Sequence, residues 1–206
     1  MSNVIPLDYP DAVAMATAAL EADELVVVPT DTVYGVVSAI RSTAIARIYA
    51  VKSRPVDRPI PVLLAYPEAA EQVVSDFPAW ARQLAEAFWP GPLTLVLPRH
   101  ADLPENLSPW PTVGVRMPDH NEVREVIAAA GGAIASTSAN LSSQPPACTV
   151  HTAIDYLADA IALYLDGGPC PGSVPSTVVA MEQDELQVLR KGPIGASVLR
   201  EVLQLS

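Results

Sequence analysis

The sequence predicts an α/β fold in which helices flank a mixed β-sheet. Short apolar or β-branched runs are mixed along the chain with Ala-rich segments of helical length, without a strict alternation. Two pairs of strand candidates, 93–97 with 112–116 and 176–181 with 186–190, follow one another without a helix between them. This order predicts antiparallel neighbours within the sheet. No linker and no repeat divides the 206 residues, so we expect one domain spanning 1–206.

Helices are expected where Ala-rich or amphipathic segments lie between turn signals. The first such segment follows Pro10, which suits a first helical turn, and the pair Gly131–Gly132 ends a later helix. The expected helices span 11–22, 42–51, 67–74, 78–88, 121–130, 150–158 and 195–203. The expected strands span 25–28, 61–65, 93–97, 112–116, 133–136, 161–165, 176–181 and 186–190. The proline-rich stretch 98–111 and the Gly/Pro stretch 166–174 are expected to be loops.

The chain is acidic overall, with a formal net charge of −11 and a pI near 4.5. A basic surface supplies most non-specific affinity for nucleic acid, so this charge argues against a general nucleic-acid binder. Half of the 12 Lys and Arg residues nevertheless lie in the motif segments described below. These cations are Lys52, Arg54, Arg58, Arg116, Arg190 and Lys191. Their concentration predicts an anion-binding pocket on an otherwise acidic protein.

Other classes of site find little support in the sequence. Cys148 and Cys170 form no C-x-x-C motif, so we expect free thiols rather than a redox or metal site. The three histidines show no ligand spacing. The first residues lack the pattern of a signal peptide, and no apolar run approaches the length of a membrane span. We therefore expect a cytoplasmic protein.

A polar loop, Pro29-Thr30-Asp31-Thr32-Val33-Tyr34-Gly35, follows the first expected strand. Hydroxyl groups at the carboxyl end of a strand can bind a small polar ligand. The alternative is a capped turn in which Thr and Asp satisfy the local backbone.

A basic loop, segment 52–59, is expected after the helix that follows. It places Lys52, Arg54 and Arg58 within seven residues. Three cations this close repel one another unless an anion lies among them, and a triphosphate is the obvious candidate. The alternative is a solvated basic turn. The two prolines, Pro55 and Pro59, favour a positioned site because they stiffen the loop.

Four later segments also place hydroxyls or cations at the ends of expected strands. Arg116 ends an expected strand, where it could bind a carboxylate or form only a surface ion pair. Residues 136–140, Ser-Thr-Ser-Ala-Asn, are short and mostly polar, and they either let a ligand approach the backbone or form a local turn. Segments 175–179 and 190–193 again place a hydroxyl or a cation at a strand end. Glycine-loop nucleotide motifs, a G-x-S-x-G motif and zinc signatures are absent from the sequence.

In this order, the segments resemble the YrdC/Sua5 family of threonylcarbamoyl-AMP synthases. The resemblance covers about 25–192 and implies a twisted sheet with a concave, positively charged face. The motifs that carry it are Pro29–Gly35, Lys52-x-Arg54-Pro55, Trp89-Pro90-Gly91-Pro92-Leu93-Thr94, Val115-Arg116-x-Pro118, Ser136–Asn140 and Pro175-Ser176-Thr177-Val178. The chain resembles the short form of the family, without the extra C-terminal domain.

The resemblance implies a specific reaction. L-Threonine and bicarbonate combine as a carbamate, which attacks the α-phosphate of ATP, and pyrophosphate leaves. The product, threonylcarbamoyl-AMP, is then used by other proteins to modify adenosine 37 of certain tRNAs. Mg²⁺ is expected to bridge the phosphates, held through ATP and water rather than by protein ligands. We expect weak or no direct tRNA binding and no membrane association.

The resemblance also implies roles for individual residues. Lys52 and Arg54 are expected to be catalytic, holding the phosphates and the carbamate. The residues expected to bind ATP are Arg54, Arg58, Thr112, Ser138, Asn140 and Arg190. The residues expected to bind threonine are Thr30, Thr32, Arg116, Ser136 and Ser176, with Arg116 on the carboxylate.

The chain departs from the family pattern at three places. Leu63 lies in the strand where many relatives carry a histidine, Ser143 stands where glycine is common, and Ala180 stands where aspartate is common. These departures leave alternatives open. The chain could be a paralogue acting on another small carbamoyl acceptor, a non-catalytic RNA-binding module, or a relative of the carbamoyl-adenylate enzymes of hydrogenase maturation.

Overall fold

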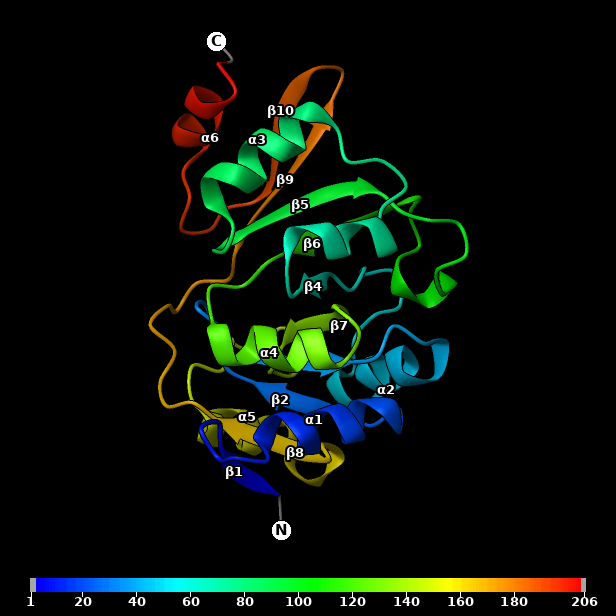
Figure 1. Ribbon diagram of the computed structural model, residues 1–206, viewed down its shortest axis with the longest axis vertical. Coiled ribbons are helices and arrows are strands. Elements are labelled where there is room, and N and C mark those ends of the chain that lie inside the picture. Colours follow the sequence, from blue (N-terminus) through cyan, green and yellow to red (C-terminus); the bar gives the residue numbers. More distant parts are fainter. Residues whose placement is uncertain (1–2, 205–206) are drawn as a thin grey trace.

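A single mixed sheet of ten strands forms the framework of the protein. The computed structural model describes residues 3–204. The strands run in the order β1-β8-β2-β3-β7-β4-β6-β5-β9-β10 from one end of the molecule to the other (Figure 1). The predicted fold class, a twisted mixed sheet with flanking helices, is confirmed.

Parallel and antiparallel pairs are both present in this sheet. The strands are β1 Val4–Pro6, β2 Val26–Val28, β3 Gly35–Ser38, β4 Val62–Leu64, β5 Leu93–Pro98, β6 Thr112–Arg116, β7 Ala133–Ser138, β8 Leu163–Asp166, β9 Thr177–Glu182 and β10 Glu185–Arg190. Strands β5 and β6 pair antiparallel, as do β9 and β10, which confirms both predicted pairs. Strand β9 also pairs parallel with β5, so the closing hairpin is joined to the rest of the sheet.

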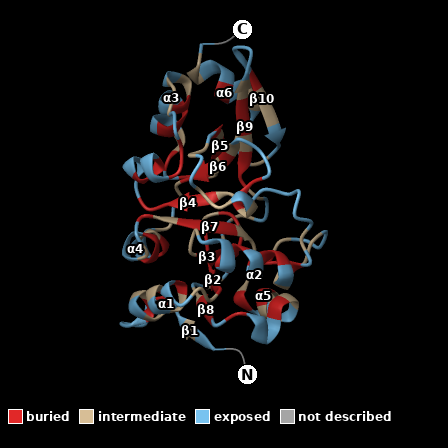
Figure 2. Ribbon diagram, turned by 90° about the vertical axis from the view of Figure 1, so that its right-hand side faces the viewer, coloured by how far each residue is buried: buried red, intermediate tan, exposed pale blue. Residues whose placement is uncertain are grey.

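Helices pack on both faces of the sheet. The α-helices are α1 Ala12–Glu21, α2 Ser42–Lys52, α3 Ala79–Phe88, α4 Asn121–Ala129, α5 Val150–Leu157 and α6 Ala196–Val202. Short 3₁₀ helices are η1 Pro67–Gln72, η2 Glu105–Leu107 and η3 Ala158–Ala160. In Figure 2, α1 and α4 lie on one side of the sheet and α2 and α5 on the other. Among the described residues, no helix is long and apolar enough to cross a membrane.

Two apolar clusters hold these layers together. The larger one joins the inner faces of α2, α3 and α5 to residues such as Val36, Leu95 and Val115. The smaller one joins α1 and α4 to residues such as Val26 and Leu63 on the opposite face. Strand β2 buries residues in both clusters and is therefore apolar throughout, whereas β5 and β6 bury only one face, in the larger cluster, and therefore alternate.

Four elements differ from the sequence-based expectation. The short strands β1 and β3 were not expected, because their apolar runs, Val4-Ile5 and Val36-Val37, are too short to be recognised alone. Strand β3 is stabilised by pairing on both sides, with β2 and β7. Strand β7 continues to Ser138, so Ser136–Ser138 belong to the strand and do not leave it as a loop. Residues 67–72 form a 3₁₀ helix rather than an α-helix.

Candidate functional site

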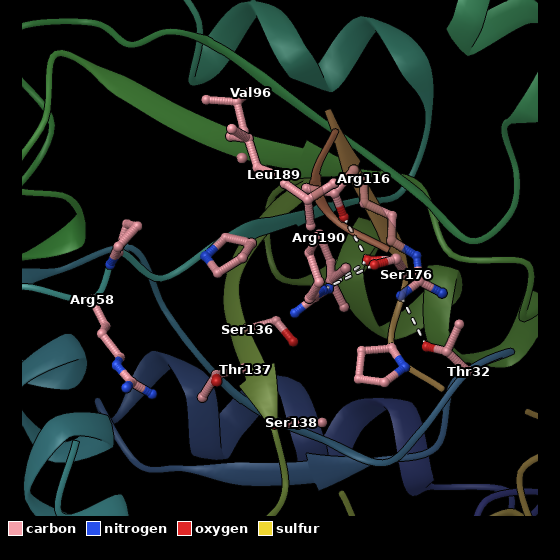
Figure 3. A pocket seen from close by; sticks show the side chains of 18 of the residues that line it. Thr32, Arg58, Val96, Arg116, Ser136, Thr137, Ser138, Ser176, Leu189 and Arg190 are labelled. Atoms are coloured by element: carbon pink, nitrogen blue, oxygen red, sulfur yellow. Dashed lines mark hydrogen bonds between the residues drawn. The ribbon is translucent and has the colours of Figure 1, made fainter. Parts of the chain in front are cut away.

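A cavity of about 680 Å³ lies on one face of the sheet and collects most of the predicted site residues. The predicted residues that line it are Thr30, Thr32, Arg54, Arg58, Thr112, Arg116, Ser136, Ser138, Ser176 and Arg190. They come from β6, β7, β10 and the loops after β2 and α2 and before β9 (Figure 3). The structure therefore brings together segments that lie up to 160 residues apart in the sequence.

The alternation of strand side chains explains why these residues share one face. On β6, Thr112 and Arg116 line the cavity, whereas Val113 and Val115 between them belong to the larger apolar cluster. On β5, Thr94 lines the cavity between buried leucines that face the core. The two-residue period of the strands thus places polar side chains on the face that lines the cavity and apolar side chains in the core.

The charged side chains among the described lining residues of the cavity are all cationic. Arg54, Arg58, Arg116 and Arg190 line it, and among the described lining residues none is Asp or Glu. Burial lowers the pKa of Arg190, and the neighbouring guanidinium groups of Arg116 and Arg54 lower it further. Arginine remains charged despite such shifts, so the cavity favours an anionic ligand that bridges the guanidinium groups.

The loop after β2 is held by its own threonines. Thr30 Oγ1 donates to the carbonyl of Val33 at 2.7 Å and accepts from the backbone N–H of Thr32 at 3.1 Å. The hydroxyls of Thr30 and Thr32 lie 3.0 Å apart. The capped-turn interpretation is therefore correct for Thr30, and the same turn presents Thr30 and Thr32 to the cavity.

Arg116 is buried and already has a counter-ion. Its Nη2 forms an ion pair with Asp31 Oδ1, and the side chains are 8% and 12% exposed. Its Nε donates to the carbonyl of Gly91 at 3.0 Å and its Nη1 to Thr32 Oγ1 at 3.0 Å. Burial lowers the pKa of Arg116, and Asp31 opposes that shift. The guanidinium is thus fixed in place while some of its N–H groups remain available to a ligand.

Lys52 does not line the cavity, unlike the other two cations of its segment. It is the last residue of α2, only 1% exposed, and its Nζ donates to the backbone carbonyls of Ser138 and Asn140. Burial and the charge of Arg54 lower the pKa of Lys52 to about 7, although the carbonyl acceptors favour its charged form. Lys52 therefore ties the end of α2 to the end of β7. The helical spacing from Ile48 is the signal that could have placed it on the buried face.

Asn140 also lies outside the cavity lining. Its Nδ2 donates to the carbonyls of Leu141 and Gln144, at 2.9 and 2.7 Å. The side chain therefore shapes the turn after β7, next to the carbonyls that Lys52 binds. This arrangement matches the local-turn alternative for that segment.

Sequence reasoning gave no role to several lining residues, among them Thr94 and Trp110. Thr94 is buried, and its hydroxyl lies 2.7 Å from Ser176 Oγ. Trp110, 59% exposed, lies at the cavity with Leu189, 58% exposed. Thr94 could have been found from its place between core-facing leucines. Trp110 lies in a loop whose path no local pattern predicts.

A second cavity of about 620 Å³ adjoins the first and shares Thr32 with it. Its lining includes Asp31 and Asp119. The Asp31–Arg116 ion pair therefore joins an acidic residue of one cavity to a basic residue of the other.

Comparisons with known proteins agree with this arrangement. The family model described as telomere recombination, for Sua5, YciO and YrdC proteins, matches residues 18–192. A protein of Mycobacterium leprae is 37% identical over 98% of this chain and 94% of its own length. The threonylcarbamoyl-AMP synthase of Bacillus subtilis is 39% identical over 93% of this chain and 56% of its own length.

Solved structures of related proteins also match this chain over nearly its whole length. The crystal structure of P. abyssi Sua5 complexed with L-threonine matches with a TM-score of 0.93 and 32% identity. This match covers 98% of this chain and 61% of that protein, so the chain spans less than two thirds of P. abyssi Sua5. E. coli YciO, at 23% identity and a TM-score of 0.85, shares the fold. The cavity-lining motifs, the family match and the near-complete alignments show that this chain belongs to the Sua5/YciO/YrdC family.

Proposed function

We propose that this chain is an L-threonylcarbamoyladenylate synthase. The observation that carries this proposal is the convergence of the predicted hydroxyls and arginines on one cavity without a carboxylate among its described lining residues. Relatives named threonylcarbamoyl-AMP synthase and the L-threonine complex of P. abyssi Sua5 support the substrate assignment. No observation on this chain favours an RNA-binding module instead.

The reaction balances as a displacement at phosphorus. The amine of threonine adds to the carbon of bicarbonate, and water is lost, giving a carbamate. A carbamate oxygen attacks the α-phosphorus of ATP, and the bond to the β-phosphate oxygen breaks. Pyrophosphate leaves with the bonding electrons. Catalysis of such a transfer is mainly positioning and charge neutralisation, which an arginine-lined cavity supplies.

Arg54 and Arg58 are assigned to the phosphates. Both line the cavity, and Arg54 is oriented by hydrogen bonds to the carbonyls of Arg58 and Pro59, at 3.3 and 2.8 Å. Thr112, Ser138 and Arg190 are assigned to the rest of the nucleotide. Guanidinium groups held by carbonyls cost little reorganisation when the anion arrives.

The amino acid is assigned to the end of the cavity formed by Thr30, Thr32, Arg116, Ser136 and Ser176. Its carboxylate would meet the N–H groups of Arg116 that Asp31, Thr32 and Gly91 leave available. Charge-assisted hydrogen bonds of this kind are the strongest that a small ligand can form.

Leu63 contributes an apolar wall to the same cavity. It is 4% exposed and stands where many relatives carry a histidine. A small amino-acid side chain fits an apolar wall, so L-threonine, L-serine and L-valine are the informative substrates to compare.

Lys52 is assigned to positioning rather than to the phosphates. Its ammonium group binds the carbonyls at the end of β7, and Ser138 from that strand end lines the cavity. Lys52 would therefore act on the nucleotide through the placement of Ser138. Asn140 would act in the same indirect way through its turn.

Mg²⁺ is expected to enter with the nucleotide. The described residues lining the cavity offer hydroxyls and guanidinium groups but no carboxylate, so they do not form a protein site for Mg²⁺. The ion would be held by phosphate oxygens and water.

We also propose that the product passes to tRNA-modifying proteins in the cytoplasm, with little direct binding of tRNA by this acidic chain.

Pyrophosphate release tests the proposal. The purified protein is incubated with ATP, Mg²⁺, bicarbonate and L-threonine, and each component is omitted in turn. We expect release that depends on all of the substrates. Release without threonine, or the same rate with every amino acid, would contradict the assignment.

A further inference from the structure

A buried pair of hydroxyls lies beside the arginines of the amino-acid end of the cavity. Thr94 Oγ1 and Ser176 Oγ are 2.7 Å apart, and each residue is only 3% exposed. Both line the cavity. At this distance the two hydroxyls share a hydrogen bond, and either atom could be the donor.

Arg190 fixes the other side of Ser176. Its Nη2 donates to Ser176 Oγ at 3.0 Å, and its Nε donates to the carbonyl of the same residue at 3.0 Å (Figure 3). A serine oxygen has two acceptor lone pairs and one proton. Arg190 occupies one lone pair, so the direction of the bond to Thr94 decides where the Ser176 proton points.

The strands hold Thr94 rigidly. Strand β5 pairs parallel with β9, and Thr94 stands opposite Val178. The backbone N–H of Thr177 donates to the carbonyl of Pro92 at 2.9 Å, which fixes the loop before β9 against β5. On the other side, a Cβ at Gly114 would lie 3.0 Å from Thr94 Cγ2, so the glycine leaves room for the threonine methyl group.

We propose that Thr94 is a positioning residue for the amino-acid substrate: it donates to Ser176 Oγ, so that Ser176 donates its own proton to an anionic oxygen of the ligand. With Arg190 and Thr94 both donating, the lone pairs of Ser176 are filled and its proton points away from both. Arg190 donates to the same oxygen of Ser176, so its positive charge also attracts an anion that accepts this proton. Donation from Thr94 to Ser176 therefore favours an anionic ligand more than donation from Ser176 to Thr94 does.

This inference rests on the proposed function for the identity of the ligand, a carboxylate or carbamate oxygen of the amino acid. The inference adds Thr94 to the amino-acid end of the cavity as a residue that contacts Ser176 rather than the substrate. A hydroxyl fixed in advance loses less entropy on binding than a freely rotating one. Loss of Thr94 should therefore weaken ligand binding although Ser176 remains.

The test is a double-mutant cycle read by calorimetric binding of L-threonine and, separately, by turnover. The variants are Thr94→Val, Thr94→Ser, Ser176→Ala and the Thr94→Val/Ser176→Ala double variant. Valine keeps the shape and removes the hydroxyl, whereas serine keeps the hydroxyl. Thr152→Val is the matched control, because Thr152 on α5 shares a 3.0 Å hydroxyl pair with the N-cap residue Thr149 and does not line the cavity.

We expect Thr94→Val to weaken threonine binding about tenfold and to raise KM with little change in kcat. Thr94→Ser should restore binding, and Thr152→Val should leave it unchanged. The double variant should bind no more weakly than Ser176→Ala alone, because Thr94 acts through Ser176.

Additive losses in the double variant would overturn the inference, since they would show that Thr94 acts on the ligand independently. Failure of serine to restore binding, or wild-type affinity in Thr94→Val, would also overturn it, as would a wild-type protein that binds no threonine. A wild-type protein that binds threonine without turnover would contradict the proposed function, whereas the binding cycle would still decide the role of Thr94.

Discussion

Arg116 and Asp31 form a buried ion pair at the boundary between the two cavities of this protein. The pair holds the loop after β2 against the end of β6, and so brings Thr32 to the guanidinium. It also means that the arginine assigned to the substrate carboxylate is already neutralised before a ligand binds.

Asp31→Asn should lower the free energy of unfolding by about 3 kcal/mol, because it leaves a buried guanidinium without its counter-ion. A substrate carboxylate can then replace the lost charge. The rise in Tm on adding L-threonine should therefore be larger in the variant than in the wild type. Thermal unfolding with and without threonine measures both effects.

Glu24→Gln is the control for that variant, because it removes an exposed partner of Arg47. An exposed pair of this kind contributes about 0–1 kcal/mol. Equal stability of Asp31→Asn and the control would show that the Arg116 pair is not important for folding.

Arg54→Ala and Arg58→Ala should each lower kcat/KM for ATP by about a hundredfold or more, because each removes a charge from the phosphate end of the cavity. Arg124→Ala is the control. Arg124 bonds to Asn121 on the exposed surface of α4 and does not line the cavity. Steady-state kinetics with varied ATP give the values. Near-normal kinetics in both variants would show that segment 52–59 is a solvated basic turn and does not bind the phosphates.

Gly172→Ala should disrupt the loop after β2. A Cβ at Gly172 would lie 2.8 Å from the carbonyl oxygen of Thr32 and 3.0 Å from its Cα, and these backbone atoms cannot move independently of the loop. We expect a raised KM for threonine. Gly195→Ala is the matched control, because the nearest atom there is Ser197 Oγ at 3.9 Å. Unchanged threonine kinetics in Gly172→Ala would show that the loop tolerates displacement.

Lys52 should make the stability of the protein depend on pH. Its pKa is lowered in the folded state to about 7 from a model-peptide value of 10.5, chiefly by burial. Between these values the unfolded chain binds a proton that the folded chain does not, so stability falls as pH falls from about 10 to 7. Below pH 7 both states are protonated and this contribution becomes constant.

The comparison for Lys52 is with Lys52→Met, which cannot titrate. The unfolding free energy of the wild type relative to the variant should rise by up to about 1.4 kcal/mol per pH unit between pH 7 and 10. Denaturant unfolding at several pH values measures the difference. A flat difference would mean that the carbonyls of Ser138 and Asn140 keep the ammonium charged throughout.

The sequence predicted the sheet and the site segments because their signals are local. Apolar alternation marks strands such as β5 and β6, and turn residues mark helix ends such as Gly131, which has a φ of +102°. Strand β3 was missed because its four residues become a strand only through pairing with β2 and β7. Short strands of this kind are decided by tertiary contacts rather than by propensity.

Individual roles were harder to predict than membership of the site. Lys52 and Arg54 are two residues apart, yet one ends a helix against the core and the other enters the cavity. Asp31 belongs to the polar loop Pro29–Gly35, but its partner Arg116 is 85 residues away. The direction of a side chain and a long-range ion pair depend on the fold, which spacing along the chain does not show.

The central claim, that this cavity joins threonine, bicarbonate and ATP into an adenylate, is tested most directly by mass spectrometry of the product. The protein is incubated with ATP, Mg²⁺ and L-threonine in either unlabelled or ¹³C-labelled bicarbonate. We predict a threonylcarbamoyl-AMP peak whose mass rises by one unit with the labelled bicarbonate, together with pyrophosphate in equal amount. An adenylate without the label, or ATP consumption without this product, would contradict the account.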